Sequence, residues 1–228
     1  MKMNILAEHF LLKHLPPEDM EKLAGLVHSR TYKNNQPMFL KGDPASGMMA
    51  VARGRVRIVT YSAEGKEVVL RVIGAGEVFG EIALIDGGER TADAIAMGET
   101  EVLILERSSF RPYLESNPAL CIKLLEIMCE RLRSTSEQLE DFSFLDLETR
   151  LAKRLLALAE SHGEESKGGV RIALNLSQQM LGAMTGASRE AVNKQLRSWE
   201  EDGFLTLGRG SVTINDAEAL DAIVQASV

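Results

Sequence analysis

Residues 176–196 read LSQQMLGAMTGASREAVNKQL, and this stretch predicts two helices separated by a short turn. The turn falls around Thr185, Gly186 and Ala187. Ser188 follows, and a serine hydroxyl at the start of a helix accepts a hydrogen bond from a backbone N–H about three positions on. Two helices joined in this way form a helix-turn-helix.

The segments on either side of this stretch extend the pattern. Residues 203–214, GFLTLGRGSVTI, predict two short strands around a glycine turn, which is a wing. Residues 170–173 predict one more short strand, and before it Leu151, Leu155 and Leu158 recur on one face of a predicted helix. We therefore expect a winged helix-turn-helix over residues 146–228.

The second helix of the pair carries the charge expected of a DNA-reading surface. Over residues 188–199, three basic residues and one acidic residue give a net charge of +2, although residues 147–228 hold 9 Lys or Arg and 11 Asp or Glu. Arginine can donate two hydrogen bonds to guanine, and glutamate can accept one from cytosine. The alternative is a solvated charged face. The candidate DNA-binding residues are Ser177, Gln178, Ser188, Arg189, Glu190, Asn193, Lys194 and Arg209.

The composition of the whole chain limits the possible functions. The 228 residues, 45% of them hydrophobic, suit two small globular domains. The formal net charge of −7 argues against a protein that coats nucleic acid, so positive charge is expected only on small helix faces. Two cysteines, no visible secretory signal and no long apolar stretch predict a cytoplasmic protein without a membrane span.

Residues 30–107 have the pattern of strands. Short apolar or alternating runs such as VRIVTY (56–61), VVLRVI (68–73) and VLIL (102–105) are separated by glycines. Many short strands with regular turn signals predict a small antiparallel barrel or roll.

A long helix is predicted to follow, with a break near Asn117 and Pro118. Apolar residues recur along it at alternating spacings of four and three, which is the 3.5-residue repeat of two helices packed along their length. A homodimer is therefore expected, and the alternative is a single helix packed on its own domain. The predicted seam consists of Cys121, Leu125, Met128, Leu132, Thr135, Leu139 and Phe142.

The stretch GEVFGEIALIDGGERTA, residues 76–92, points to an anionic ligand. Gly80 lets backbone N–H groups approach a ligand closely, and Arg90 is a good bidentate partner for phosphate. Thr91 adds a hydroxyl, and Glu81 could accept from sugar hydroxyls. An exposed ion pair of Arg90 with Asp86 or Glu89 is an equally good interpretation of these residues alone.

Taken together, these motifs resemble the cyclic AMP receptor branch of the CRP/FNR family of bacterial transcription regulators. FGEIAL (79–84) followed by RTA (90–92) is similar to the family's phosphate-binding cassette, and SREAV (188–192) to the start of its recognition helix. TSE (135–137) resembles the ligand contact of its dimer helix, and FLD (144–146) its hinge. The resemblance covers about residues 10–214.

This resemblance implies an α+β fold. It consists of an N-terminal antiparallel β-roll (a double-stranded β-helix that binds the cyclic nucleotide) over residues 1–117, a dimerisation helix and hinge over 118–145, and a winged helix-turn-helix over 146–228. It also implies roles for single residues. Gly80 and Glu81 would hold the ribose 2′-hydroxyl and the cyclic phosphate, with backbone help from Ile82 and Ala83, while Arg90 and Thr91 bind the phosphate. Thr135 would contact the base from the same subunit, Ser136 from the partner subunit, and Arg131 would pair with Glu81.

Some residues depart from the family pattern. The segment between Gly80 and Arg90 is one residue shorter than in the prototype, and Thr91 replaces the commoner serine. Asn193 and Lys194 stand where the prototype has Gly-Arg, which relaxes base preference because lysine is a point charge. The sequence lacks the clustered N-terminal cysteines of the family's iron–sulfur branch. Its histidines form no recognisable axial pair for haem.

We therefore predict a homodimeric transcription regulator that binds a palindromic TGTGA-like operator with cyclic AMP as its allosteric ligand and RNA polymerase as a partner. Cyclic GMP is a possible second ligand, because the hydroxyls of Thr135 and Ser136 can donate as well as accept. The alternative is a regulator of the same fold with another effector, or one that binds DNA constitutively. An enzyme such as a phosphodiesterase is disfavoured, since no metal-ligand cluster, nucleophile–base pair or Walker loop is visible.

Overall fold

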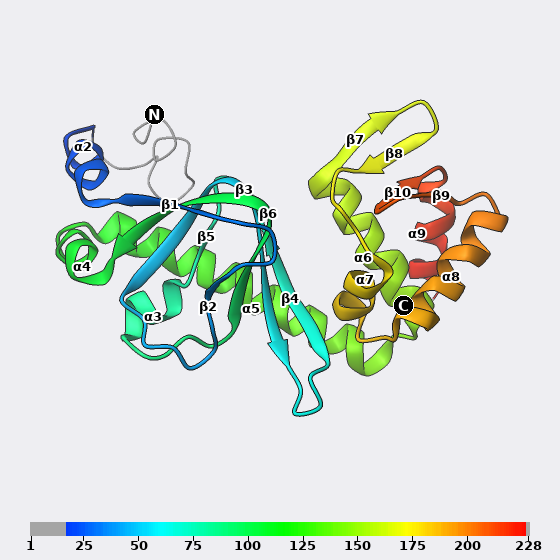
Figure 1. The fold of residues 1–228 in the computed structure, drawn as a ribbon, viewed down its shortest axis with the longest axis horizontal. Coiled ribbons are helices and arrows are strands. Elements are labelled where there is room, and N and C mark those ends of the chain that lie inside the picture. The colour runs from blue at the N-terminus through cyan, green and yellow to red at the C-terminus, as the bar shows by residue number, and fades with distance from the viewer. Residues whose placement is uncertain (1–16, 227–228) are drawn as a thin grey trace. The chain divides into compact units, whose positions relative to one another are not determined.

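The computed structural model describes residues 17–226. These residues divide into two compact units, one made of residues 17–62 and 69–133 and the other of residues 63–68 and 134–226. Figure 1 traces both units along the chain. None of the helices in the described part of the chain is long and apolar enough to cross a membrane.

The first unit is built on an antiparallel six-stranded sheet in the order β1-β6-β3-β4, with β2 paired to β6 and β5 paired to β3. The long strands β3 and β6 pair over most of their length, with two register shifts near Arg53. The predicted antiparallel roll is confirmed. The strands are β1 (His28–Tyr32), β2 (Pro37–Phe39), β3 (Gly47–Tyr61), β4 (Glu67–Ile73), β5 (Val78–Phe79) and β6 (Asp93–Glu106).

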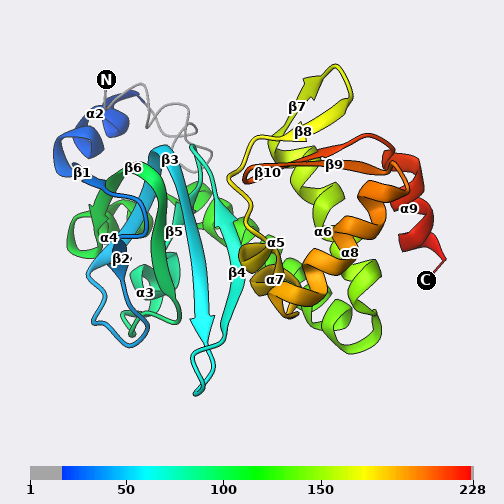
Figure 2. The same cartoon turned by 45° about the vertical axis from the view of Figure 1, so that its right-hand side comes forward.

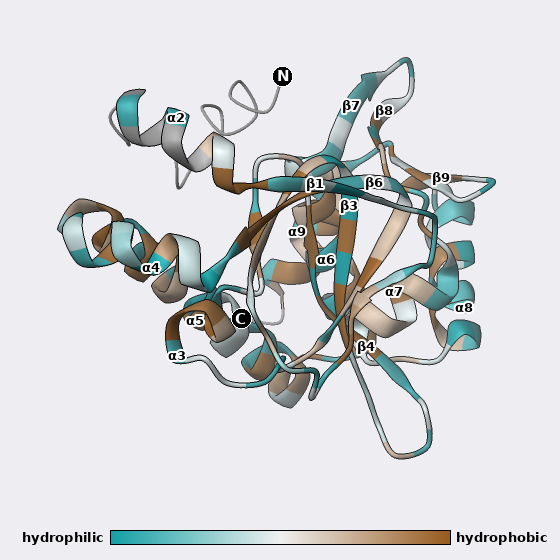
Figure 3. Cartoon of the chain, turned by 60° about the vertical axis from the view of Figure 1, so that its left-hand side comes forward, coloured by the Kyte–Doolittle hydropathy of each residue, from teal (hydrophilic) through white to brown (hydrophobic). Residues whose placement is uncertain are grey.

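Helices α2 (Pro17–Leu26), α3 (Glu81–Asp86) and α4 (Arg107–Ser116) belong to the same unit. Its core has two parts. One lies inside the roll around Val51, Val56 and Phe79. The other joins strands β3 and β6 to the start of α5 through Leu120 and Leu124. Figure 3 shows hydrophobic residues along β3 and β6.

Helix α5 (Pro118–Phe144) begins at the predicted break. Its buried side chains, Leu120, Leu124 and Ile127, face the core of the roll. The opposite face exposes Ile122, Leu125, Leu132 and Leu139, each more than half exposed.

This face contains Leu125, Leu132 and Leu139 of the predicted seam, and Thr135 of that seam is exposed as well. Met128 packs against the roll core, and Cys121 is half-buried with its thiol against the carbonyl of Leu114. Cys129 and Ser136 are also exposed. Apolar residues therefore lie on two faces of α5, one toward the roll and one toward solvent, and which of them a partner helix covers stays a prediction.

The second unit contains the predicted helix-turn-helix and wing, drawn in Figure 2. Its strands form a four-stranded sheet in the order β7-β8-β10-β9. The elements are α6 (Leu147–His162), β7 (Gly163–Ser166), β8 (Gly169–Ile172), α7 (Gln178–Thr185), α8 (Arg189–Glu201), β9 (Leu205–Gly208), β10 (Ser211–Ile214) and α9 (Ala217–Gln225). Neither strand β7 nor helix α9 was predicted from the sequence. Strand β7 was missed because its residues, GEES, have no alternation of apolar and polar side chains.

The end of α5 is fastened to the turn between α7 and α8. Arg150 Nε donates to the carbonyl of Thr185 at 3.0 Å, and its guanidinium lies 5.7 Å from the ring centroid of Phe142. Arg150 also donates to the carbonyl of Leu145. A Cβ atom on Gly186, which has φ of 69°, would lie 3.0 Å from the Phe142 ring. Glycine is therefore required in the turn for both its backbone and its small size.

Candidate functional site

A cavity of about 80 Å³ in the first unit gathers many of the residues singled out in the sequence. We call it the Arg90 cavity. Six predicted ligand-binding residues line it: Gly80, Glu81, Ala83, Arg90, Thr91 and Arg131. The other lining residues are Phe39, Ile58, Phe79, Glu89 and Ala92.

Gly80 positions the cavity's central arginine. It precedes α3 with φ of 77°, in the left-handed region where a Cβ atom is strained. A Cβ atom there would also lie 2.4 Å from Arg90 Nη1. Two independent requirements therefore select glycine, and the second exists only because the guanidinium packs directly on the backbone.

Arg90 is buried, with 7% of its surface exposed. Its Nη1 donates to the carbonyl of Gly80 at 3.0 Å, and its guanidinium lies 4.1 Å from the ring centroid of Phe39. Desolvation lowers the pKa of Arg90, and the nearby Glu81 carboxylate opposes that effect. The ion pair of Arg90 with Asp86 or Glu89, considered as an alternative, does not form.

Glu81 opens helix α3 and is 1% exposed. Its Oε2 forms an ion pair with Arg131 Nη1, as predicted, and Arg131 Nη2 donates to the carbonyl of Val78. One buried donor in the cavity, Arg90 Nε, has no hydrogen-bond partner among the described residues. Since buried polar atoms are normally bonded, this donor favours a ligand that supplies an acceptor.

The second candidate site is the exposed start of α8. Ser188 caps the helix, because its hydroxyl oxygen accepts from the N–H of Ala191 at 3.1 Å. The side chains of Arg189, Asn193 and Lys194 are exposed and make no hydrogen bond or ion pair with the described residues. A hydrogen bond from its own backbone N–H, and then one from Ser188, lower the pKa of Glu190, which is therefore ionised at neutral pH.

Neighbouring elements contribute further polar groups. Ser177 caps α7 by accepting from Met180 N at 3.1 Å, and Arg209 is exposed at the tip of the β9–β10 hairpin. Arg197 is instead paired with Glu200 at 2.7 Å, so it is less available to a partner. Figure 3 shows α8 as mostly hydrophilic on its outer face. Three side chains of the same helix, Val192, Leu196 and Trp199, are buried.

Comparison with known proteins identifies the two units. A family model described as a cyclic nucleotide-binding domain matches residues 29–117, and one described as a Crp-like helix-turn-helix domain matches residues 149–223. The chain is 31% identical over 216 residues to a CRP-like cAMP-activated global transcriptional regulator of Mycobacterium tuberculosis, covering 95% of this chain and 96% of that protein. The chain belongs to the CRP/FNR family.

Other members of the family show the same similarity. The chain is 32% identical over 213 residues to the cyclic AMP receptor protein of Thermus thermophilus, covering 93% of this chain and 95% of that one. The solved structure of the c-di-GMP responsive global regulator CLP of Xanthomonas campestris matches with a TM-score of 0.77 at 25% identity, covering 87% of this chain and 99% of the other. This CRP-family protein is therefore a cyclic nucleotide-responsive transcription regulator and not an enzyme.

Not every predicted ligand contact lies in the Arg90 cavity. Ile82 is 42% exposed on α3 and does not line the cavity, so its backbone contact with a ligand stays a prediction. Thr135 and Ser136 are exposed on α5 in the second unit, and their contacts with a base stay predictions. Within residues 17–226, no group of three or more His, Cys, Asp or Glu side chains is placed to hold a metal ion. His9 and His14, considered for haem, lie outside the described residues.

Sequence reasoning missed the aromatic wall of the cavity. Phe39 and Phe79 lie 40 positions apart in the chain, yet their ring centroids are 5.8 Å apart. Strand β5, which carries Phe79, pairs with β3, whereas β2, which carries Phe39, pairs with β6. No local pattern indicates this contact, because it depends on how the roll closes.

Proposed function

We propose that this protein is a homodimeric transcription regulator gated by cyclic AMP. The observation that carries the proposal is a buried donor without a hydrogen-bond partner, Arg90 Nε, in a cavity that the buried carboxylate of Glu81 also lines. A cyclic nucleotide offers a ribose hydroxyl that donates to Glu81 and a phosphate that accepts from Arg90. Thr91, which also lines the cavity, adds a hydroxyl for the phosphate.

The base would be held from α5. Thr135 of one subunit and Ser136 of the partner subunit would each contact the base, so the ligand touches both subunits. The exposed face of α5 supports the dimer, because Leu125, Leu132 and Leu139 follow the 3.5-residue repeat and are more than half exposed. A ligand that contacts both subunits would bind one arrangement of the two helices more tightly than another. Such a difference in affinity is what shifts a protein from one conformation to the other.

The DNA-binding part of the proposal rests on α8. Arg189 and Glu190 are exposed in its first turn, where a recognition helix meets base edges. Ser177, Gln178, Ser188 and Arg209 would contact phosphates, and Asn193 and Lys194 would reach the next bases. A two-fold dimer implies a palindromic operator, and the family resemblance suggests a TGTGA-like half-site. RNA polymerase is the expected partner, and the cytoplasm the expected location.

A single titration series tests this function. Purified protein is titrated with cyclic AMP by calorimetry, and then with a fluorescent palindromic operator at fixed cyclic AMP concentrations. Micromolar or tighter binding of the nucleotide, together with operator binding that rises with its occupancy, supports the proposal. Absence of heat at millimolar cyclic AMP contradicts it.

A second candidate is the same fold with a different effector or constitutive DNA binding. Two observations support this second candidate. The cassette between Gly80 and Arg90 is one residue shorter than in the prototype, and the Xanthomonas relative is described as responsive to c-di-GMP. A c-di-GMP arm and a nucleotide-free arm of the operator titration distinguish these cases.

A further inference from the structure

Helix α3 ends with carbonyl groups that need a donor from outside the helix. In a longer helix the N–H of Gly88 would bond the carbonyl of Leu84. The helix ends at Asp86, however, and the N–H of Gly88 donates to Asp86 Oδ1 at 2.7 Å instead. The last carbonyls of a helix are then satisfied by side chains or water. How firmly the end of α3 is held therefore depends on which group bonds them.

Arg107, the first residue of α4, supplies the donor. Its Nε donates to the carbonyl of Leu84 at 2.8 Å, and its Nη2 donates to the carbonyl of Ile85 at a longer 3.5 Å. A guanidinium in this place also neutralises the negative end of the helix dipole. The backbone N–H of Arg107 donates to the carbonyl of Ser46, just before β3, at 2.6 Å. Arg107 therefore ties the end of α3 to the sheet of the roll.

Gly87 lets this guanidinium lie directly against the backbone. The residue has φ of 74°, in the left-handed region, and a Cβ atom there would lie 3.1 Å from Arg107 Cζ. Gly80 and Arg90 have the same relationship at the other end of α3. An arginine is thus packed on a glycine at each end of the helix that lines the Arg90 cavity.

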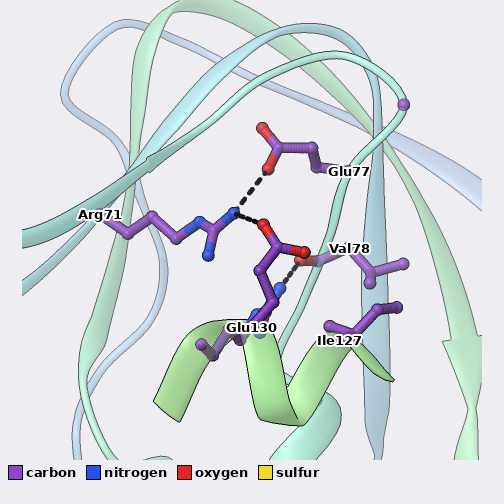
Figure 4. Close-up of a pocket in the computed structure, with 7 residues that line it drawn as sticks. Arg71, Glu77, Val78, Ile127 and Glu130 are labelled. Carbon is purple, nitrogen blue, oxygen red and sulfur yellow. Dashed lines mark hydrogen bonds and ion pairs between the residues drawn. The ribbon is translucent and has the colours of Figure 1, made fainter. Parts of the chain in front are cut away.

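A third arginine of this unit, Arg71, makes a different kind of bridge. Its Nη2 pairs with Glu77 at 3.2 Å and with Glu130 at 3.6 Å, beside a cavity of about 130 Å³ (Figure 4). Their side chains are 39% and 63% exposed, and exposed ion pairs of this kind contribute little. Arg107 differs because its partners are backbone carbonyls, which fix the position of a helix.

We infer that Arg107 is a positioning residue for the cyclic nucleotide. It does not line the Arg90 cavity, but it holds the helix that carries Glu81 into that cavity. Helix α3 is six residues long, and residues 87–89 join its end to Arg90. Because this segment is short, movement at the end of α3 displaces both Glu81 and Arg90, and binding groups displaced by about 1 Å bind poorly. The inference rests on the proposed function, since it assumes a cyclic nucleotide in this cavity.

The competing interpretation is a helix cap that contributes to stability alone. Loss of such a cap lowers the free energy of unfolding but leaves the affinity of the folded protein for nucleotide unchanged. A positioning residue changes that affinity, and its loss also makes the segment from α3 to Arg90 more mobile.

The test measures the affinity for cyclic AMP by calorimetry, well below the melting temperature of each variant. Arg107→Ala removes the donors, and Arg107→Lys keeps a cation that can donate to one carbonyl. Arg111→Ala is the matched control, because Arg111 lies one turn further along α4, is paired with Glu115 and lines neither cavity. Hydrogen–deuterium exchange of residues 81–92 in the ligand-free protein reports the mobility of the segment.

We expect Arg107→Ala to weaken cyclic AMP about tenfold and to raise exchange over residues 81–92. Arg107→Lys should recover part of the affinity. Arg111→Ala should change neither measurement.

Gly87→Ala tests whether the effect acts through the end of α3. Its methyl group would displace the Arg107 guanidinium, so it should also weaken cyclic AMP. The double variant Gly87→Ala with Arg107→Ala should lose less affinity than the sum of the two single losses, because both disturb one contact. This pair, with Arg107→Lys, keeps the inference testable if Arg107→Ala does not fold.

Two outcomes overturn the inference while the proposed function stands. One is an Arg107→Ala variant that binds cyclic AMP as tightly as wild type, whatever its melting temperature. The other is a set of fully additive losses for Gly87→Ala and Arg107→Ala. Wild-type protein that binds neither cyclic AMP nor cyclic GMP overturns the proposed function and this inference together.

Discussion

Arg131 of α5 and Glu81 of α3 form an ion pair in which the carboxylate side chain is 2% exposed and the guanidinium side chain 21% exposed. The pair joins the first turn of the cassette helix to the long helix within the first unit. Removing one member leaves the other charge buried without its counterion, which costs more than the pair itself contributes.

We predict that Glu81→Ala lowers the free energy of unfolding by about 2–4 kcal/mol, because Arg131 then keeps a buried charge without its partner. Urea unfolding followed by circular dichroism measures this. The double variant Glu81→Leu with Arg131→Met should recover most of the loss, since neither charge remains. A single variant as stable as wild type would show that the pair contributes little.

Arg90→Leu should abolish the response to nucleotide without destabilising the free protein. Burial desolvates the guanidinium and lowers its pKa, and its bond to Gly80, its contact with Phe39 and the nearby Glu81 carboxylate only partly offset that cost. Thermal unfolding with and without millimolar cyclic AMP checks both parts. Arg90→Lys is the control, because it keeps the charge but not the bidentate geometry. A ligand-induced rise in the Arg90→Leu variant would contradict this assignment.

Arg189→Ala should weaken specific operator binding by about 1–3 kcal/mol and leave nucleotide affinity unchanged. The residue is exposed in the first turn of α8 and is not engaged in an ion pair. Fluorescence anisotropy with operator and scrambled DNA at several salt concentrations separates base reading from phosphate contact. Arg197→Ala is a matched control, because Arg197 lies on the same helix but is paired with Glu200. Equal losses on both DNA sequences would reassign Arg189 to phosphate.

Leu132→Arg should convert the protein to a monomer. Leu132 is 68% exposed in the middle of the apolar face of α5, and a charge there opposes burial against a second helix. Sedimentation velocity gives the oligomeric state. Leu40→Arg, at a residue 47% exposed outside α5, should not change it. A monomeric wild type would remove the basis for this interface.

Asp146 should contribute a pH-dependent part of the stability of the second unit. The N–H of Thr149 donates to Asp146 Oδ1 at 2.8 Å, and this bond lowers the pKa of Asp146 below its usual value of about 4. A lowered pKa in the folded state stabilises above the unfolded pKa, and this stability is lost as pH falls through the folded value. Asp146→Ala should cost about 1 kcal/mol at pH 7 and less at pH 3. Chemical unfolding at both pH values tests it, and an equal cost at both would contradict the ionic contribution.

The local features of the second unit were predictable because their signals are close together in the chain. Ser177 and Ser188 cap their helices, and Gly186 turns between them, where short-range hydrogen bonding and backbone conformation require those residues. The β-roll followed from short strands and glycine turns. In each case the physical cause lies within a few residues of its effect.

The rest depended on how distant segments meet. The heptad pattern of α5 predicted that Leu125, Leu132 and Leu139 share one face, and all three are exposed. The sequence could not tell that Met128 packs toward the roll while Cys129 is exposed. The burial of Arg90 against Phe39 likewise requires the closed roll.

The contacts around Arg150 also limit where this protein can bend. Phe142 packs on Gly186, Arg150 bonds to the carbonyls of Leu145 and Thr185, and Lys153 pairs with Asp141 at 2.7 Å. Bending the chain at residues 144–146 would therefore break several contacts at once, because they hold the last turn of α5 to the turn before α8 within the second unit.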